Sequence, residues 1–177
     1  MNSRALFAVL NFFFVGSAYV FFEPILANEL IGFYGLEESV QALVFFVFLG
    51  FFGLGGILLL CIPERVVRRK MMIGMGLVAG VGCYMMGPSA PFPRDLILLE
   101  VALGVAGLSS AMSMNSSSGE SLKAMKPVFP KHYERLADLN AKIINIMSSG
   151  NNLINPLIAA GLADWLDYRT TAEFTGG

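Results

Sequence analysis

Five apolar stretches, separated by shorter polar segments, run along this chain of 177 residues. They cover roughly residues 5–27, 40–62, 71–87, 96–116 and 137–163. A helix needs about 20 mostly apolar residues to cross ~30 Å of hydrocarbon, and each stretch is long enough. The pattern therefore predicts an all-α fold, a polytopic membrane bundle of five transmembrane helices that form a single domain over residues 1–177.

The basic residues predict an orientation for this bundle. Nine of them lie on one side, at the N-terminus and in every second connection: Arg4, Arg65, Arg68, Arg69, Lys70, Lys123, Lys126, Lys131 and Arg135. The other side keeps only Arg94 and Arg169. Short cytoplasmic loops retain Lys and Arg during insertion. We therefore expect the N-terminus and the loop 63–70 to be cytoplasmic, with residues 117–136 as a connection along the cytoplasmic interface.

Composition supports a membrane protein and narrows the function. Hydrophobic residues make up 55% of the chain and charged residues 14%, whereas a soluble domain carries about 25% charged residues. The sequence has no metal-ligand cluster, phosphate-binding loop or Ser/His/Asp arrangement. We therefore expect that the protein is not an enzyme and that it has no cofactor and no metal site. Membrane topology explains the basic residues, and we expect no nucleic-acid partner.

The fifth apolar stretch carries a polar stripe. Its members follow one another at spacings of 4, 3, 4 and 3 residues, which places them on one face of a helix: Asp138, Lys142, Asn145, Ser149 and Asn152. Further polar residues widen it: Asn140, Ser148, Asn151 and Asn155. One interpretation is interhelical hydrogen bonding, which is common in membranes. The other is the wall of a water-filled path, in which Asn145, Ser149 and Asn152 are the candidate site residues.

Two carboxylates lie inside other apolar stretches. Glu23 and Glu100 are predicted at similar depth, each ~6–8 Å below the non-cytoplasmic surface. Ionisable groups inside a membrane span are costly and usually face a cavity or a proton path, and like-charge repulsion within one cavity would favour proton binding by one of the two. Alternatively, both lean toward the interface, or Glu100 pairs with Arg94.

Three segments resemble one transporter family in their order and spacing. The first is Tyr19-Val20-Phe21-Phe22-Glu23-Pro24, and the third runs from Ser149-Gly150 through Asn155-Pro156 to Arg169. Between them, Glu64-Arg65-Val66-Val67-Arg68-Arg69-Lys70 is similar to a cytoplasmic acid-Arg-x-Gly-Arg-Arg/Lys motif, with Val67 in place of the glycine. Together they resemble helices seven to eleven, in the C-terminal half of a major facilitator superfamily transporter. The vesicular amine and drug/proton antiporter branch is the most similar, since its seventh helix has a comparable Glu-Pro step.

The resemblance implies part of a secondary transporter, with proton-coupled export of a small organic cation or drug-like solute as the activity. It matches Glu23 to the seventh-helix glutamate and Glu64, Arg65, Arg68 and Arg69 to the loop motif. It also implies an incomplete half, because such transporters have two six-helix halves around a midplane site. The implied partners are membrane lipid, a small solute, and a missing half-transporter or other membrane chains.

One departure from the family opens an alternative. The eleventh helix of the amine branch carries an acidic residue where this chain has Asn145. The loss of that charge would impair coupling that needs both acids. The alternative is a transporter-derived structural or accessory subunit of a larger membrane complex, with no transport activity of its own.

Overall fold

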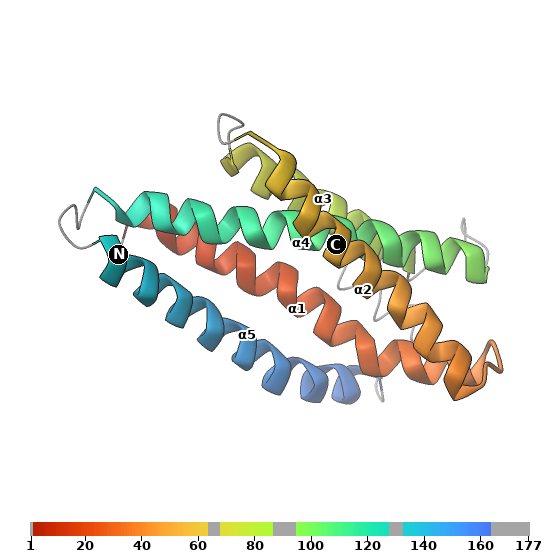
Figure 1. Cartoon of the computed structure of the whole chain (residues 1–177). Coiled ribbons are helices and arrows are strands. Elements are labelled where there is room, and N and C mark those ends of the chain that lie inside the picture. The colour runs from red at the N-terminus through yellow and green to blue at the C-terminus, as the bar shows by residue number, and fades with distance from the viewer. Residues whose placement is uncertain (1, 64–67, 87–94, 128–132, 164–177) are drawn as a thin grey trace.

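The computed structural model describes residues 2–63, 68–86, 95–127 and 133–163. Five helices account for nearly all of them (Figure 1): α1 Ser3–Gly32, α2 Glu38–Cys61, α3 Arg68–Met86, α4 Leu96–Met125 and α5 Tyr133–Ala163. No strand occurs in these ranges. The prediction of an all-α fold is confirmed for the described part of the chain.

Short polar side chains mark where two of the helices begin. The side-chain oxygen of Asn2 accepts a hydrogen bond from the backbone N–H of Arg4 at 3.2 Å, and that of Asp95 accepts from Ile97 at 3.1 Å. Both residues satisfy an N–H group that the first helical turn leaves without an intrahelical partner. After α1 ends, Gly35 has a φ of 62°, which favours glycine and turns the chain into α2.

The predicted end of the fourth helix is wrong. We expected it near residue 116, followed by an interfacial connection over 117–136, whereas α4 continues to Met125 and α5 already begins at Tyr133. The extra turns are helical because they are packed. Ala124 and Met125 form a buried cluster with Ala5 of α1 and Leu136 of α5.

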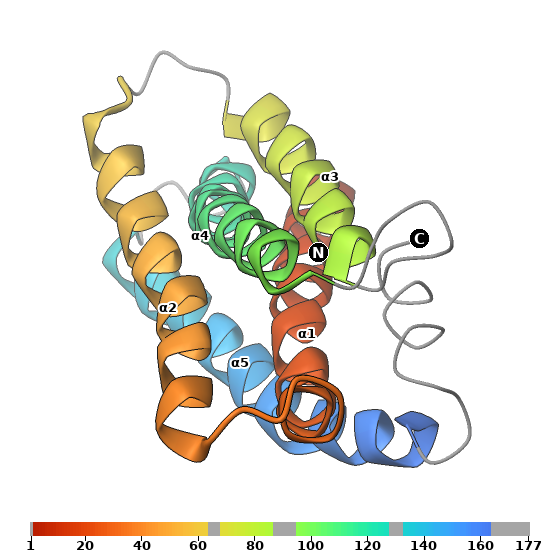
Figure 2. The same ribbon diagram turned by 90° about the vertical axis from the view of Figure 1, so that its right-hand side faces the viewer.

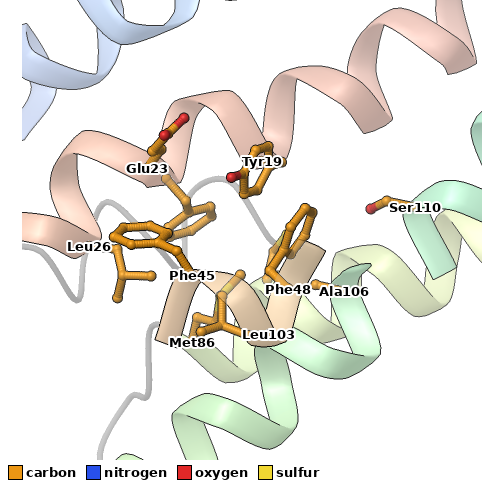
Figure 3. A pocket seen from close by; sticks show the side chains of 11 residues that line it. Tyr19, Glu23, Leu26, Phe45, Phe48, Met86, Leu103, Ala106 and Ser110 are labelled. Carbon is orange, nitrogen blue, oxygen red and sulfur yellow. The ribbon is translucent and has the colours of Figure 1, made fainter. Parts of the chain in front are cut away.

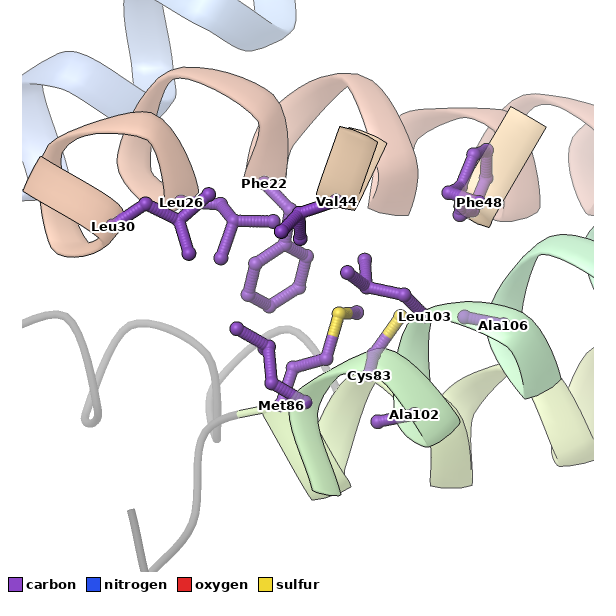
Figure 4. Packing of buried hydrophobic residues seen from close by; sticks show 11 residues of the cluster. Phe22, Leu26, Leu30, Val44, Phe48, Cys83, Met86, Ala102, Leu103 and Ala106 are labelled. Atoms are coloured by element: carbon purple, nitrogen blue, oxygen red, sulfur yellow. The ribbon is translucent and has the colours of Figure 1, made fainter. Parts of the chain in front are cut away.

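α4 is the central helix of the bundle. It packs against α1, α2 and α3, while α5 packs mainly against α1, on the far side from α3 (Figures 1 and 2). The main hydrophobic core joins the first four helices (Figure 4), and its buried members include Phe22, Leu26, Phe48, Cys83, Met86 and Leu103. This core fixes the C-terminal half of α1 against α4.

Two glycines allow α2 and α4 to approach closely. A Cβ atom on Gly107 of α4 would lie 2.5 Å from the backbone oxygen of Phe48, and one on Gly55 of α2 would lie 2.5 Å from that of Leu108. Real Cβ atoms do not come so close. Backbone contact of this kind is typical of helices that associate in lipid, where small residues take the interface positions.

Three helices are long and apolar enough to cross a membrane: Ser3–Gly32, Ser39–Cys61 and Leu96–Met125. α2 also exposes large apolar side chains outside the bundle, among them Phe46 and Leu60. These features indicate a membrane protein. α3 begins with three basic residues, and α5 carries many polar ones. The number of five spans therefore stays a prediction.

Candidate functional site

A row of buried serines faces the neighbours of α4. Ser109, Ser113, Ser117 and Ser121 follow one another at four-residue intervals and are each at most 1% exposed. The side-chain NH₂ of Asn11 on α1 donates to Ser113 Oγ at 3.0 Å and to Ser117 Oγ at 2.8 Å. Ser113 Oγ in turn donates to the backbone oxygen of Met72 on α3 at 2.9 Å. These bonds connect α1, α3 and α4. The serine row was not predicted, although its four-residue spacing is a sequence signal that could have identified it.

An ion pair closes one end of this serine row. Arg4 Nε donates to Glu120 Oε1 at 2.5 Å, with Glu120 only 2% exposed. A buried carboxylate needs such a partner, because an isolated charge is costly in a low-dielectric interior. Glu120 falls in the predicted connection 117–136, and no sequence pattern predicted this pair.

α5 meets α1 through its asparagines. Asn151 is 2% exposed; its side chain donates to the backbone oxygen of Phe13 at 3.1 Å and accepts from Ser17 Oγ at 2.9 Å. Asn155 donates to the same Asn151 oxygen at 3.3 Å. Asn151 and Asn155 are two of the residues that widened the predicted stripe. A third, Asn140, donates to Ser118 of α4 at 3.4 Å. The hydrogen-bonding interpretation therefore holds for these three residues.

The predicted stripe itself points elsewhere. All five of its members are exposed in this chain: Asp138, Lys142, Asn145, Ser149 and Asn152. Lys142 Nζ donates to Asp138 Oδ2 at 2.6 Å. A third face of α5 is apolar and also exposed, with Leu153 at 70% and Leu157 at 72%. α5 thus has an asparagine face on α1, an apolar face, and an outer polar face, by which we mean Asp138, Lys142, Asn145 and Ser149. Asn152 lies between the outer polar face and the asparagine face.

A cavity with a mixed polar and apolar lining lies where α5 approaches α1, α2 and α4. Its volume is about 170 Å³. Its polar lining comes from Tyr19, Ser110, Ser148, Asn151 and Asn152, and its apolar lining includes Val15, Phe52 and Met114. We call it the midplane cavity, because Tyr19 and Ser110 lie near the middle of α1 and α4. Of the stripe residues, it brings in Asn152; Asn145 and Ser149 do not line it.

Glu23 lines a small adjoining pocket of about 10 Å³ (Figure 3). Tyr19 and Ser110 line both spaces, and the ring of Tyr19 stacks on Phe48 with centroids 3.9 Å apart. In Figure 3 the Glu23 carboxylate is directed away from the apolar side chains of Leu26 and Leu103. Glu23 itself is exposed in this chain and does not line the midplane cavity. The two adjoining spaces offer hydroxyl, amide and aromatic groups to a solute.

The other predicted site residues line neither the midplane cavity nor the adjoining pocket. Glu100 is half-buried and lines neither space, although Leu103, one turn away on α4, lies in the same pocket as Glu23. In the loop motif, Arg68 lies against Gly119 of α4, and Arg69 is exposed. Glu64 and Arg65 lie outside the described residues. Within the described ranges, no group of three or more His, Cys, Asp or Glu side chains could hold a metal ion.

We expect Asn151→Ala to destabilise the bundle by about 1–2 kcal/mol, because it removes three interhelical or intrahelical hydrogen bonds at a buried site. Asn145→Ala, the same change on the outer polar face, should stay within about 0.5 kcal/mol. Thermal unfolding of the purified chain in detergent measures both. Equal losses in the two variants would contradict this assignment of the faces of α5.

No protein-family model matches the chain, and no curated protein matches it.

Proposed function

We propose that this chain is part of a secondary transporter of the major facilitator type, and that the wall from Glu23 to Asn152 forms one side of its solute path. The observation that carries the proposal is the midplane cavity, which has polar groups in its mostly apolar lining and lies in a bundle with three helices of membrane-spanning length. Polar groups at this depth are expensive unless they face water, a partner or a substrate.

The size of the cavity supports a shared site. Its volume of about 170 Å³ is below the roughly 300–1,000 Å³ of complete ligand pockets. A second half, as in other transporters with a midplane site, would supply the remaining wall. In this arrangement the N-terminus and the loop 63–70 lie on the cytoplasmic side, as the distribution of basic residues favours.

The residues that line the midplane cavity and the adjoining pocket suit a small organic cation whose transport is coupled to proton exchange. Glu23 supplies a carboxylate that can hold either a proton or the cation. The stacked rings of Tyr19 and Phe48 present a π-face, to which cations are attracted. Asn145 does not line the cavity, so Glu23 alone carries the coupling in this proposal.

A second candidate function is a structural subunit of a larger membrane complex. The outer polar face favours it, because Asn145 and Ser149 are exposed and line neither of the two spaces of the site. Amides and hydroxyls facing lipid would be costly, so a neighbouring chain would cover them. The two functions differ in whether water reaches the cavity side of α5.

Glu23→Gln tests the transport function. We expect it to abolish flux of ethidium, a small organic cation, driven by a pH gradient in vesicles from native cells that carry the substitution. The reason is that the amide keeps the size of the side chain and cannot exchange a proton.

Glu100→Gln is the matched control, because Glu100 lines neither space; it should retain the flux. Both variants must reach wild-type levels in the membrane. Unchanged pH dependence in Glu23→Gln would count against the proton-site role.

A further inference from the structure

A third cavity lies at the other end of the bundle from Glu23, where α1 and α3 begin and α4 ends. Its volume is about 350 Å³, within the range of ligand pockets. Six residues line it: Ser3, Arg4, Phe7, Arg69, Met72 and Glu120. It does not touch the midplane cavity, and its chemistry is different.

The cavity carries a positive charge that the fold itself does not use. Arg4 Nε donates its hydrogen bond to Glu120. The terminal guanidinium nitrogens of Arg4 can therefore donate to another acceptor. Arg69 is exposed and forms no ion pair with any described residue. Two arginines against one carboxylate give a net charge of about +1. The N-terminal turns of α1 and α3 add partial positive charge.

These groups match a phosphate. Guanidinium groups bind phosphate oxygens through paired N–H donors, and the hydroxyl of Ser3 can add a further donor. Phe7 and Met72 form an apolar side of the same cavity. The lining therefore suits a ligand that joins an anionic group to an apolar one.

The position of the cavity along α1 indicates where this ligand comes from. α1 has 30 residues and is thus about 45 Å long, which exceeds the ~30 Å of hydrocarbon in a bilayer. Ser3 and Arg4, at its first turn, reach the headgroup layer when the apolar part spans the core. We propose that this cavity binds a phosphate group, presented there by the headgroup of an anionic phospholipid.

Arg69→Gln tests the proposal in the purified full chain. Native mass spectrometry in detergent measures binding of phosphatidylglycerol, with phosphatidylcholine as the zwitterionic comparison. We expect Arg69→Gln to weaken phosphatidylglycerol binding about fivefold, the effect of one basic residue near a membrane surface. Arg69→Lys should retain most of the binding. Arg135→Gln, the same change at another exposed arginine at this end of the bundle, should have no effect.

An excess of inorganic phosphate separates the two sources of the ligand. Lipid that stays bound assigns the site to the phospholipid, whereas displacement assigns it to free phosphate; either result supports a phosphate site. Equal binding of both lipids, or equal losses in Arg69→Gln and Arg135→Gln, would overturn the proposal, because general surface charge would then explain the binding.

Discussion

Arg4→Gln should lower the free energy of unfolding by about 3 kcal/mol, the largest stability effect we expect from a single substitution in this chain. The substitution leaves the Glu120 carboxylate, 2% exposed, without its partner. Removing one member of a buried pair costs about 3–5 kcal/mol, and the lower end applies because the Arg4 side chain is 50% exposed. Loss of the pair should also loosen the contact between α1 and the last turns of α4.

Unfolding can be followed through the two cysteines. Cys83 is buried and free, while Cys61 is exposed. In a Cys61→Ser background, a thiol-reactive dye therefore reports the exposure of Cys83 as the purified chain is heated in detergent. Arg135→Gln serves as the control for the loss of one positive charge at the same end of the bundle.

Two further variants separate the ion pair from simple charge loss. Glu120→Gln should cost less than Arg4→Gln, because the half-exposed Arg4 can turn to solvent, whereas Glu120 cannot. The double variant Arg4→Gln/Glu120→Gln should recover part of the loss, since no buried charge remains without a partner. A double variant as unstable as the sum of the single ones would show that the two residues are not coupled.

The apolar pattern predicted the bounds of a helix well where its buried residues are apolar and its ends are polar. The second helix begins two residues before its predicted start and ends one residue before its predicted end, because both ends are marked by polar residues or proline. The end of the fourth helix was predicted wrongly because the polar residues that follow the apolar stretch are themselves helical and buried. Ser117, Glu120 and Ser121 are polar and read as a connection, yet all three are buried against neighbouring helices. A single sequence does not say which polar residues will find partners.

The same limit applies to α5. Helical spacing identifies a polar face, but Asn151 and Asn145 are the same residue type, and only their partners distinguish them. Asn151 is buried because Ser17 and the Phe13 carbonyl lie opposite, 134 and 138 residues away in the chain. The pair of Arg4 and Glu120 spans 116 residues. Contacts this distant depend on how the helices pack, which local patterns do not encode.

Labelling of Asn152→Cys should show that water reaches the midplane cavity in the assembled protein. Asn152 lines that cavity, whereas its neighbour Leu153 lies on the exposed apolar face of α5. In the Cys61→Ser background, each position is replaced by cysteine, and intact native membranes are treated with a small, charged, membrane-impermeant thiol reagent. A membrane-permeant maleimide confirms that both cysteines are present and reactive.

The measurement that tests the transporter account most directly is the ratio of the two labelling rates with the charged reagent. The account predicts fast labelling of Asn152→Cys and almost none of Leu153→Cys, because one faces a water-filled path and the other faces lipid. Protection of Asn152→Cys that is lost only when detergent dissociates the assembly would contradict transport and support the structural subunit. Labelling of Asn152→Cys by the permeant reagent alone, as for Leu153→Cys, would contradict both functions.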